Sequence, residues 1–293
     1  MRSTPRFRFG SLFVTLFVIG FTLLALQARA ATNNALDFDG VDDVVVVNNA
    51  SAEIANATAF SLSGWVNATK STVSWGTYDG FFGFRNEIDA DFYLARVGDT
   101  SLEARFRNSG RTYFTVSPST VTVTGWHYWT VTYDGASLIL YRDGVNIGAT
   151  AATGTFSNTT TLPLYVGGRL DASNNAFYLQ GQTDNVMLWT KALTPAEVLT
   201  TMATINGDEP GLAVFYDFNQ GTAGGPNPAE TTLLDRAGTA LNGTLTNFTL
   251  DGPNSNWVAG PSSTAPTATA TATNTATNTA TNTATATATS TAT

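Results

Sequence analysis

The stretch Trp126–Gly148, WHYWTVTYDGASLILYRDGVNIG, decides the fold class of this chain. It contains two strand-like runs and the start of a third, separated by Asp134-Gly135 and Asp143-Gly144. An Asp-Gly pair between β-rich runs favours a tight hairpin, because glycine adopts positive φ angles without steric cost. The large residues of the first run fall on alternate positions, at Trp129, Val131 and Tyr133. One face of that strand can therefore be buried, and the stretch predicts an antiparallel β-structure.

This stretch resembles the central hairpin of LamG-like domains, which are jelly rolls of the concanavalin A type. In that family a Trp-His pair opens a strand that ends Tyr-Asp-Gly, and a Tyr-x-Asp-Gly turn follows. Other segments match the family in the same order: LDFDG at 36–40, FSLSGWV at 60–66, GQTDNVMLW at 181–189 and LTPAE at 193–197. The resemblance covers about residues 35–202. It implies an all-β, concanavalin A-like antiparallel jelly-roll sandwich with one short helix.

The strand and helix signals along the chain agree with that architecture. Residues 35–47 are expected to form a first strand pair, broken at Gly40, and many short β-rich runs separated by Gly, Asn and Asp follow. The helix signal lies at Thr194-Pro195-Ala196-Glu197, where Thr194 can cap, Pro195 suits the first position and Glu197 can complete a capping box. We expect this helix to end near Ala203.

The two ends of the chain differ in composition from its centre. Arginines at 2, 6 and 8 precede an apolar run, and Ala28-Arg29-Ala30 offers a cleavage site, so residues 1–30 are predicted to be a signal peptide. The apolar run is shorter than the roughly 20 residues of a membrane-spanning helix. Residues 261–293 contain mostly Thr, Ala and Asn, which predicts a disordered linker or stalk.

Between these ends we expect one sandwich. Residues 31–210 are predicted to form the LamG-like domain, and residues 211–260 to add strands that complete or flank it, because they are too few for an independent core. The resemblance and the leader together predict a protein secreted to the cell surface or medium of a bacterium.

Charge and cysteine content narrow the classes of partner. Loss of residues 1–30 removes four arginines and no acid, which leaves ten basic and 22 acidic residues and a net charge of −12. Such a surface repels phosphate backbones, so nucleic acid is not an expected partner. The chain has no cysteine, so it must rely on its core or on metal ions for stability.

Three acidic residues could carry catalysis. Glu87, Asp89 and Asp91 alternate, like the Glu-x-Asp-x-Glu strand of family 16 glycoside hydrolases, which share the jelly roll. A retaining mechanism needs carboxyl groups about 5–5.5 Å apart, whereas positions i and i+4 of a strand are roughly 13 Å apart. Asp91 is also one methylene shorter than the family's glutamate. We therefore expect no catalytic residues here, and keep a divergent glycoside hydrolase as an alternative. The single histidine, His127, is expected to make a local hydrogen bond at a strand end.

An acidic turn could bind calcium. The segment Asp39-Gly-Val-Asp-Asp43 offers carboxylates and backbone carbonyls, and Ca²⁺ takes six to eight such oxygen ligands. Similar sandwiches often hold a structural calcium ion between their terminal strands. We therefore predict Asp39, Asp43 and Asp184 as metal ligands, and a solvated acidic turn is the alternative.

Aromatic residues in the first half of the domain could contact a sugar, because aromatic faces stack on the apolar faces of sugar rings. The candidates are Trp75, Tyr78, Phe82, Tyr93 and Tyr113. The predicted function is a non-catalytic module that binds an extracellular glycan. The alternative is an adhesion or structural domain that binds a surface protein.

Overall fold

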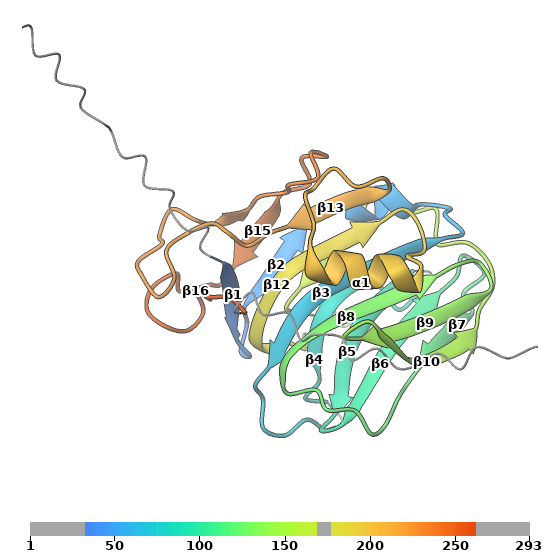
Figure 1. Cartoon of the computed structure of the whole chain (residues 1–293), viewed down its shortest axis with the longest axis horizontal. Coiled ribbons are helices and arrows are strands. Elements are labelled where there is room, and N and C mark those ends of the chain that lie inside the picture. The colour runs from blue at the N-terminus through green and yellow to red at the C-terminus, as the bar shows by residue number, and fades with distance from the viewer. Residues whose placement is uncertain (1–32, 75, 89, 169–176, 262–293) are drawn as a thin grey trace, which may run out of the picture. The chain divides into compact units, whose positions relative to one another are not determined.

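The computed structural model of the protein describes residues 33–74, 76–88, 90–168 and 177–261. They form two antiparallel sheets that pack face to face as a sandwich (Figure 1). This confirms the predicted all-β jelly roll with one α-helix. Within the described residues, no helix combines the length and the apolar character needed to cross a membrane.

Sheet A contains the stretch that decides the fold. In spatial order it consists of β10 (Val145–Ala151), β9 (Ser137–Arg142), β8 (Gly125–Tyr133), β3 (Phe60–Ala68), β12 (Gln180–Trp189), β1 (Asn34–Asp39) and β16 (Trp257–Ala259). A further strand, β13 (Leu212–Tyr216), pairs with the second half of β12. The run β8–β9–β10 is an antiparallel meander, as predicted from its Asp-Gly turns.

Sheet B is the second layer. In spatial order it consists of β14 (Thr232–Leu233), β15 (Gly243–Thr246), β2 (Val44–Val47), β11 (Leu164–Val166), β4 (Asp79–Arg85), β5 (Asp91–Gly98), β6 (Ser101–Arg107) and β7 (Tyr113–Val116). The strands of residues 211–260 therefore extend both sheets, because β13 and β16 lie in sheet A while β14 and β15 lie in sheet B.

The core lies between the sheets, where the alternate residues of each strand meet. Trp129, Val131 and Tyr133 of β8 are fully buried there, as the alternation predicted. Phe60 lies at the centre of an aromatic cluster, with ring centroids of Phe92 and Tyr133 at 4.6 and 5.2 Å. Their interlocked rings hold the two sheets in register against each other.

The first two strands are not a pair. β1 bonds to β12 and β16 of sheet A, whereas β2 bonds to β11 and β15 of sheet B. The prediction of a strand pair over residues 35–47 was therefore wrong. The chain turns at Gly40, whose φ is +78°, and passes from one sheet to the other. The sheet that a strand joins depends on which other strands can pair with it, and those strands are distant in the sequence.

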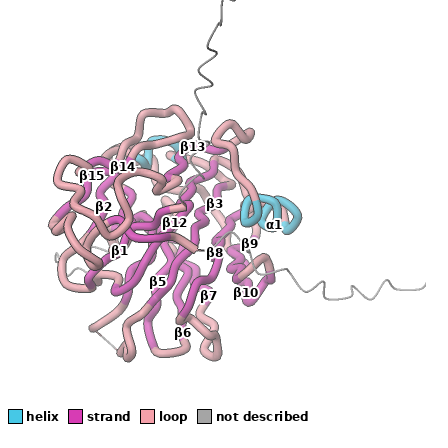
Figure 2. Tube along the Cα trace, turned by 60° about the vertical axis from the view of Figure 1, so that its left-hand side comes forward, coloured by secondary structure: helices cyan, strands magenta, loops and turns pink. Residues whose placement is uncertain are grey.

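A second, smaller core lies on the outer face of sheet A beneath α1 (Pro195–Ala203). Val198 and Met202 of the helix pack there with Tyr128 of β8 and Trp189 of β12. Figure 2 shows α1 beside β8 and β9 on this side of the sandwich. The predicted capping box is confirmed: Thr194 accepts the Glu197 amide, and the Glu197 carboxylate accepts the Thr194 amide. A short 3₁₀ helix, η1 (Ala50–Ile54), follows β2.

Candidate functional site

The outer face of sheet B carries a group of tyrosines and arginines, here called the tyrosine–arginine face. Its members are Arg85, Tyr93, Glu103, Arg105, Arg107 and Tyr113. In β5 the neighbours of Tyr93, Phe92 and Leu94, point into the core. Because successive side chains of a strand point to opposite faces, Tyr93 points outward, and the same alternation in β6 turns Arg105 and Arg107 outward.

Strand register places these side chains in two rows across the sheet. In one row Arg85 lies opposite Asp91, Asp91 opposite Arg107, and Arg107 opposite Tyr113. In the next row Gly83 lies opposite Tyr93, and Tyr93 opposite Arg105. Side chains from four consecutive strands, β4 to β7, therefore converge on one surface.

Tyr113 is the most exposed member of this face. Its exposed fraction is 57%. The guanidinium carbons of Arg105 and Arg107 lie 4.8 and 5.4 Å from the centroid of its ring. Arg105 also lies 5.8 Å from the ring of Tyr93, so that it connects the two tyrosines. An exposed aromatic ring held by two cations is a rigid platform.

Carboxylates hold the arginines in place. Arg107 Nε donates to Asp91 Oδ2 at 2.7 Å, and Arg105 Nη2 donates to Glu103 Oε2 at 3.0 Å. The hydroxyl of Tyr93 donates to Glu103 and accepts from Arg85 Nη1 at 2.9 Å. Burial acts to lower the pKa of Arg105, but Tyr93 and the nearby carboxylates outweigh it and raise that pKa. The guanidinium of Arg105 is therefore permanently charged.

The predicted ligand-contacting aromatics have different positions. Tyr113 and Tyr93 belong to the tyrosine–arginine face, although Tyr93 is only 1% exposed. Tyr78 is buried, with its ring 5.1 Å from that of Phe177. The prediction that Phe82 contacts a ligand was wrong. Its side chain points inward from β4 and packs in the main core. Trp75 lies outside the described residues.

Sequence reasoning missed Tyr165 of β11. Tyr165 lies opposite Gly83, whose other neighbour is Tyr93, and its side chain is half-buried. It therefore continues the row of Tyr93 and Arg105 across the sheet. The signal was present in the alternation of Leu164, Tyr165 and Val166, in which only the central residue avoids the core.

The two described candidates for catalysis, Glu87 and Asp91, do not lie on one strand face. Glu87 lies in the turn between β4 and β5 with a φ of 60°, and its amide donates to Asp91 Oδ1 at 3.1 Å. Asp91 opens β5, where its side chain is fully buried against Arg107. Glu87 pairs with Arg85. Asp89 lies outside the described residues. The expected alternation fails because the chain turns within the motif.

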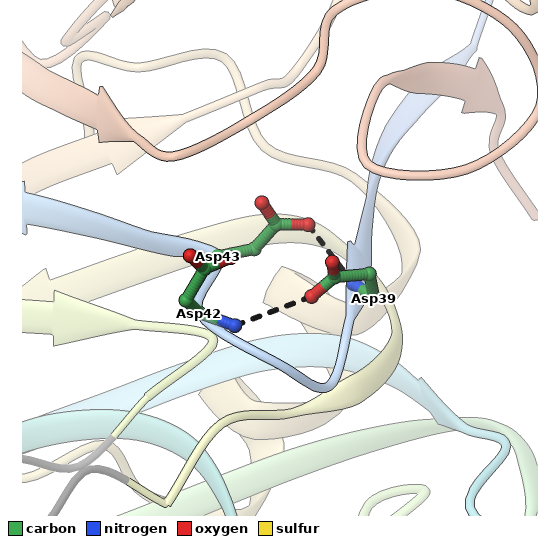
Figure 3. Close-up of side chains that lie close together, drawn as sticks. All are labelled: Asp39, Asp42 and Asp43. Atoms are coloured by element: carbon green, nitrogen blue, oxygen red, sulfur yellow. Dashed lines mark hydrogen bonds between the residues drawn. The ribbon is translucent and has the colours of Figure 1, made fainter.

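Two of the three predicted metal ligands meet in one turn. Asp39 and Asp43 lie together with Asp42, and one carboxylate oxygen of each lies within 4.8 Å of the others (Figure 3). Asp43 is buried, and both of its oxygens are engaged: Oδ2 accepts the Asp39 amide at 2.9 Å, and Oδ1 accepts the Ser255 hydroxyl at 2.9 Å. Burial raises the pKa of Asp43 to about 6. The conformation of this turn is therefore stabilised by hydrogen bonds from the Asp39 amide and the Ser255 hydroxyl to Asp43.

Asp184, the third predicted ligand, lies elsewhere. Asp39 faces Gln180 across the β1–β12 ladder, and Asp184 is four residues farther along β12, roughly 13 Å by strand rise. It lies opposite Trp65, on the outer face of sheet A. Both carboxylate oxygens are buried and make no hydrogen bond of regular geometry. Burial raises the pKa of Asp184 to about 7, while the Asn185 amide and the Asn33 side chain oppose that shift.

A cavity of about 540 Å³ lies at the end of α1, and Asn185, the chain neighbour of Asp184, is part of its lining. Its lining includes Asn33, Asn185 and Asp217, the same three residues that act on the pKa of Asp184. Met202 and Phe215 form part of its apolar wall. Arg236 also lines the cavity, where its Nε lies 3.1 Å from Oδ2 of Asp217. Asp184 itself is a buried carboxylate without regular partners, which is an environment suited to a cation.

Comparison with known proteins agrees with this architecture. A structure of a Bacteroides ovatus protein, whose suggested role is carbohydrate binding, aligns with a TM-score of 0.52 and 15% identity over 73% of this chain; the alignment spans only 58% of the other chain. The CBM40 module of a Ruminococcus gnavus sialidase, bound to α2,3-sialyllactose, aligns with a TM-score of 0.45 and 11% identity, covering 58% of this chain and 98% of that one. A pentraxin from Limulus polyphemus aligns with a TM-score of 0.44 and 12% identity, covering 59% of this chain and 83% of that one.

A search of curated proteins found no match. The model of one family matches residues 39–199, which is more than half of the sequence. The matched range includes the β8–β10 meander, the tyrosine–arginine face and the start of α1. This chain therefore belongs to the concanavalin A-like lectin/glucanases superfamily.

Proposed function

We propose that this protein is an exported, non-catalytic module that binds an extracellular carbohydrate on its tyrosine–arginine face. The observation that carries the proposal is the exposure of Tyr113, whose ring contacts two guanidinium groups. An aromatic ring stacks on the C–H face of a sugar, and charged groups beside it bind the hydroxyls. Sheet strands hold these groups, so little ordering is needed when a ligand binds.

Two further observations support a binding role. Carbohydrate binding is the suggested role of the Bacteroides ovatus protein with the same fold. Among the described carboxylates of the predicted catalytic motif, Glu87 and Asp91 are each paired with an arginine. A glycosidase needs two carboxyl groups that flank a glycosidic bond, and a paired, fully buried Asp91 does not suit that role.

The binding experiment is a glycan array probed with the chain from Ala31 onward, in calcium and then in chelator. We expect a defined set of glycans to bind, and the Tyr113→Ala variant to lose at least tenfold in affinity. The control is Val145→Ala, which removes a similarly exposed side chain, 55% against 57%, from sheet A. If no glycan binds, or if both variants bind like the wild type, this site is not a carbohydrate site. Binding to a surface protein would then be the better proposal.

The proposal includes one structural calcium ion, which the resemblance also implies. The donor set at Asp184 suits it better than the Asp39–Asp43 turn does. Ca²⁺ prefers several oxygen ligands, and Asp184 offers two buried oxygens without regular partners. Asp217 acts on the pKa of Asp184 but is itself paired with Arg236 at 3.1 Å, so the further oxygens would come from the side-chain carbonyls of Asn33 or Asn185. In the turn, by contrast, hydrogen bonds already engage both oxygens of Asp43. The ion would neutralise a carboxylate that is otherwise buried without a cation.

Calcium titration by calorimetry separates the two positions. We expect Asp184→Asn to abolish binding and to remove the stabilisation that calcium gives in thermal melts. Asp43→Asn should bind calcium like the wild type. The reverse pattern would return the ion to the Asp39–Asp43 turn, and no heat of binding in any variant would show that the fold needs no calcium.

A further inference from the structure

The basic residues of this chain are distributed unevenly. The whole chain has a net charge of −8. Nine basic residues lie in the described part, and four of them gather on β4, β6 and the loop between β6 and β7: Arg85, Arg105, Arg107 and Arg111. The acids beside them are Glu87, Asp91 and Glu103. Three of the nine described basic residues therefore lie on the tyrosine–arginine face of a protein whose net charge is negative.

The carboxylates leave part of each guanidinium unused. Arginine has five N–H donors. Within the described residues, Arg107 donates only from Nε, to Asp91, and Arg105 only from Nη2, to Glu103. The Nε atom of Arg105 is buried without an acceptor. Because that atom is enclosed, the donors left for a ligand are Nη groups of the two arginines.

Both sets of unused donors lie next to the exposed ring. The two guanidinium carbons are about 5 Å from the Tyr113 centroid. The guanidinium groups cover part of the ring, so a sugar that packs on the exposed part of Tyr113 brings its substituents toward Arg105 and Arg107. The charge of Asp91 lies beneath the face, because that side chain is fully buried. A ligand meets Arg107 before it meets this acid, whereas Glu103 lies on the face itself and engages one donor of Arg105.

These contacts point to the chemistry of the ligand. Charge-assisted hydrogen bonds are roughly twice as strong as neutral ones, and the arginine fork matches a carboxylate or sulfate with two parallel bonds. We propose that the tyrosine–arginine face binds an acidic glycan, with the carboxylate or sulfate of a sugar held by Arg105 and Arg107 while the ring stacks on Tyr113. This inference rests on the proposed carbohydrate-binding function and specifies its substrate class.

The test compares acidic glycans with their neutral parents. The chain from Ala31 onward is applied to an array that carries uronic acid-containing, sialylated and sulfated glycans, each beside its uncharged counterpart. We expect the acidic members to bind at least tenfold more tightly, and the affinity to fall as salt is raised, because exposed charge pairs are screened. The preferred class shows whether the anion is a carboxylate or a sulfate.

Variants then locate the contact. Arg105→Met should weaken binding of the acidic glycan roughly tenfold or more, and Arg105→Lys should recover only part of it, because lysine keeps the charge but lacks the fork. The control is Arg142→Met, which removes a positive charge from β9 of sheet A. Melting curves of each variant check that it is folded.

The outcomes distinguish this inference from the function on which it rests. Equal binding of neutral and acidic glycans, lost in Tyr113→Ala but not in Arg105→Met, would overturn the acidic ligand and keep the carbohydrate-binding module. No glycan binding at all would overturn both.

Discussion

The Nδ1 atom of His127 lies 2.7 Å from Oδ2 of Asp143, and Oδ1 of the same carboxylate accepts the amide of Tyr128 at 2.9 Å. Asp143 thereby connects the β9–β10 turn to the first residues of β8. Its own amide donates to the carbonyl of Tyr128 at 2.8 Å, and its φ of 51° opens the turn that Gly144 completes. One side chain thus fastens the β9–β10 turn to β8.

Replacement of Asp143 tests that relationship. Asp143→Ala removes both side-chain hydrogen bonds and places alanine at positive φ, so we expect a loss of about 2–4 kcal/mol in the free energy of unfolding. Asp143→Asn keeps an acceptor for the Tyr128 amide and tolerates this φ, and should lose less than half as much. Urea unfolding curves measure both. Equal losses would mean that the charge, and not the turn, is what matters.

Gly83 tests how closely β4 and β5 approach beneath the tyrosine–arginine face. Its φ is +142°, and a Cβ atom would lie 2.4 Å from the Cα of Tyr93. We expect Gly83→Ala to lower the free energy of unfolding by about 3 kcal/mol or more, through strain and overpacking.

Gly252→Ala is the matched control for Gly83→Ala, because its φ is +76° and a Cβ atom there has no heavy atom within 4 Å. It should lose only about 1–2 kcal/mol from the backbone conformation. At about 2–4 °C per kcal/mol, thermal melts resolve this difference. Similar melting temperatures for the two variants would contradict the close packing of Gly83.

The ion pair of Asp91 and Arg107 should contribute more to the free energy of unfolding than an exposed pair does. Asp91 is fully buried, so Asp91→Asn leaves the Arg107 cation without its partner, and we expect a loss of about 3–5 kcal/mol. The contrast is Asp99→Asn. Asp99 lies 3.9 Å from Arg96 with 59% of its side chain exposed, and the loss there should be below about 1 kcal/mol. Chemical denaturation of both variants measures the difference, and comparable losses would refute it.

The contribution of Glu197 to the stability of α1 depends on pH. Hydrogen bonding to Lys191, then to the backbone and side chain of Thr194, lowers the pKa of Glu197 from 4.5 to about 2. The folded state therefore binds fewer protons than the unfolded state between these values, so this contribution is complete above pH 4.5 and is lost as the pH falls toward 2. Because 39% of the side chain is exposed, solvent screening keeps the contribution to about 1 kcal/mol or less.

Thermal melts of Glu197→Gln and the wild type, recorded between pH 7 and pH 2, test this pH dependence. The variant should melt a few degrees lower at pH 7, and the difference should shrink as the pH approaches 2. Glu230→Gln is the control, because the Glu230 side chain makes no hydrogen bond within the described residues and should show no such trend. A difference that stays constant with pH would exclude the ionised Glu197 as its source.

The candidate site was only partly predictable. Tyr113 and Tyr93 were found because aromatic residues in a β-rich stretch are a visible signal, but the arginines that flank them were not. Arg105 and Arg107 are separated from Tyr113 by a loop, and only the pairing of β6 with β7 brings them to its ring. Phe82 was misplaced for a related reason: a bulge in β4 between Gly80 and Phe82 shifts the register and sets which of its aromatics face the core.

The sequence by itself determined the local elements: the Asp-Gly turns of the β8–β10 meander, the inward face of β8, and the capping box of α1. These follow from glycine's tolerance of positive φ, the two-residue period of a strand and hydrogen bonds between residues three apart. Only the tertiary structure decided that β1 and β2 enter different sheets, and that Asp184 is separate from the Asp39–Asp43 turn. Those outcomes depend on pairings between residues more than 100 positions apart, which a one-dimensional pattern does not contain.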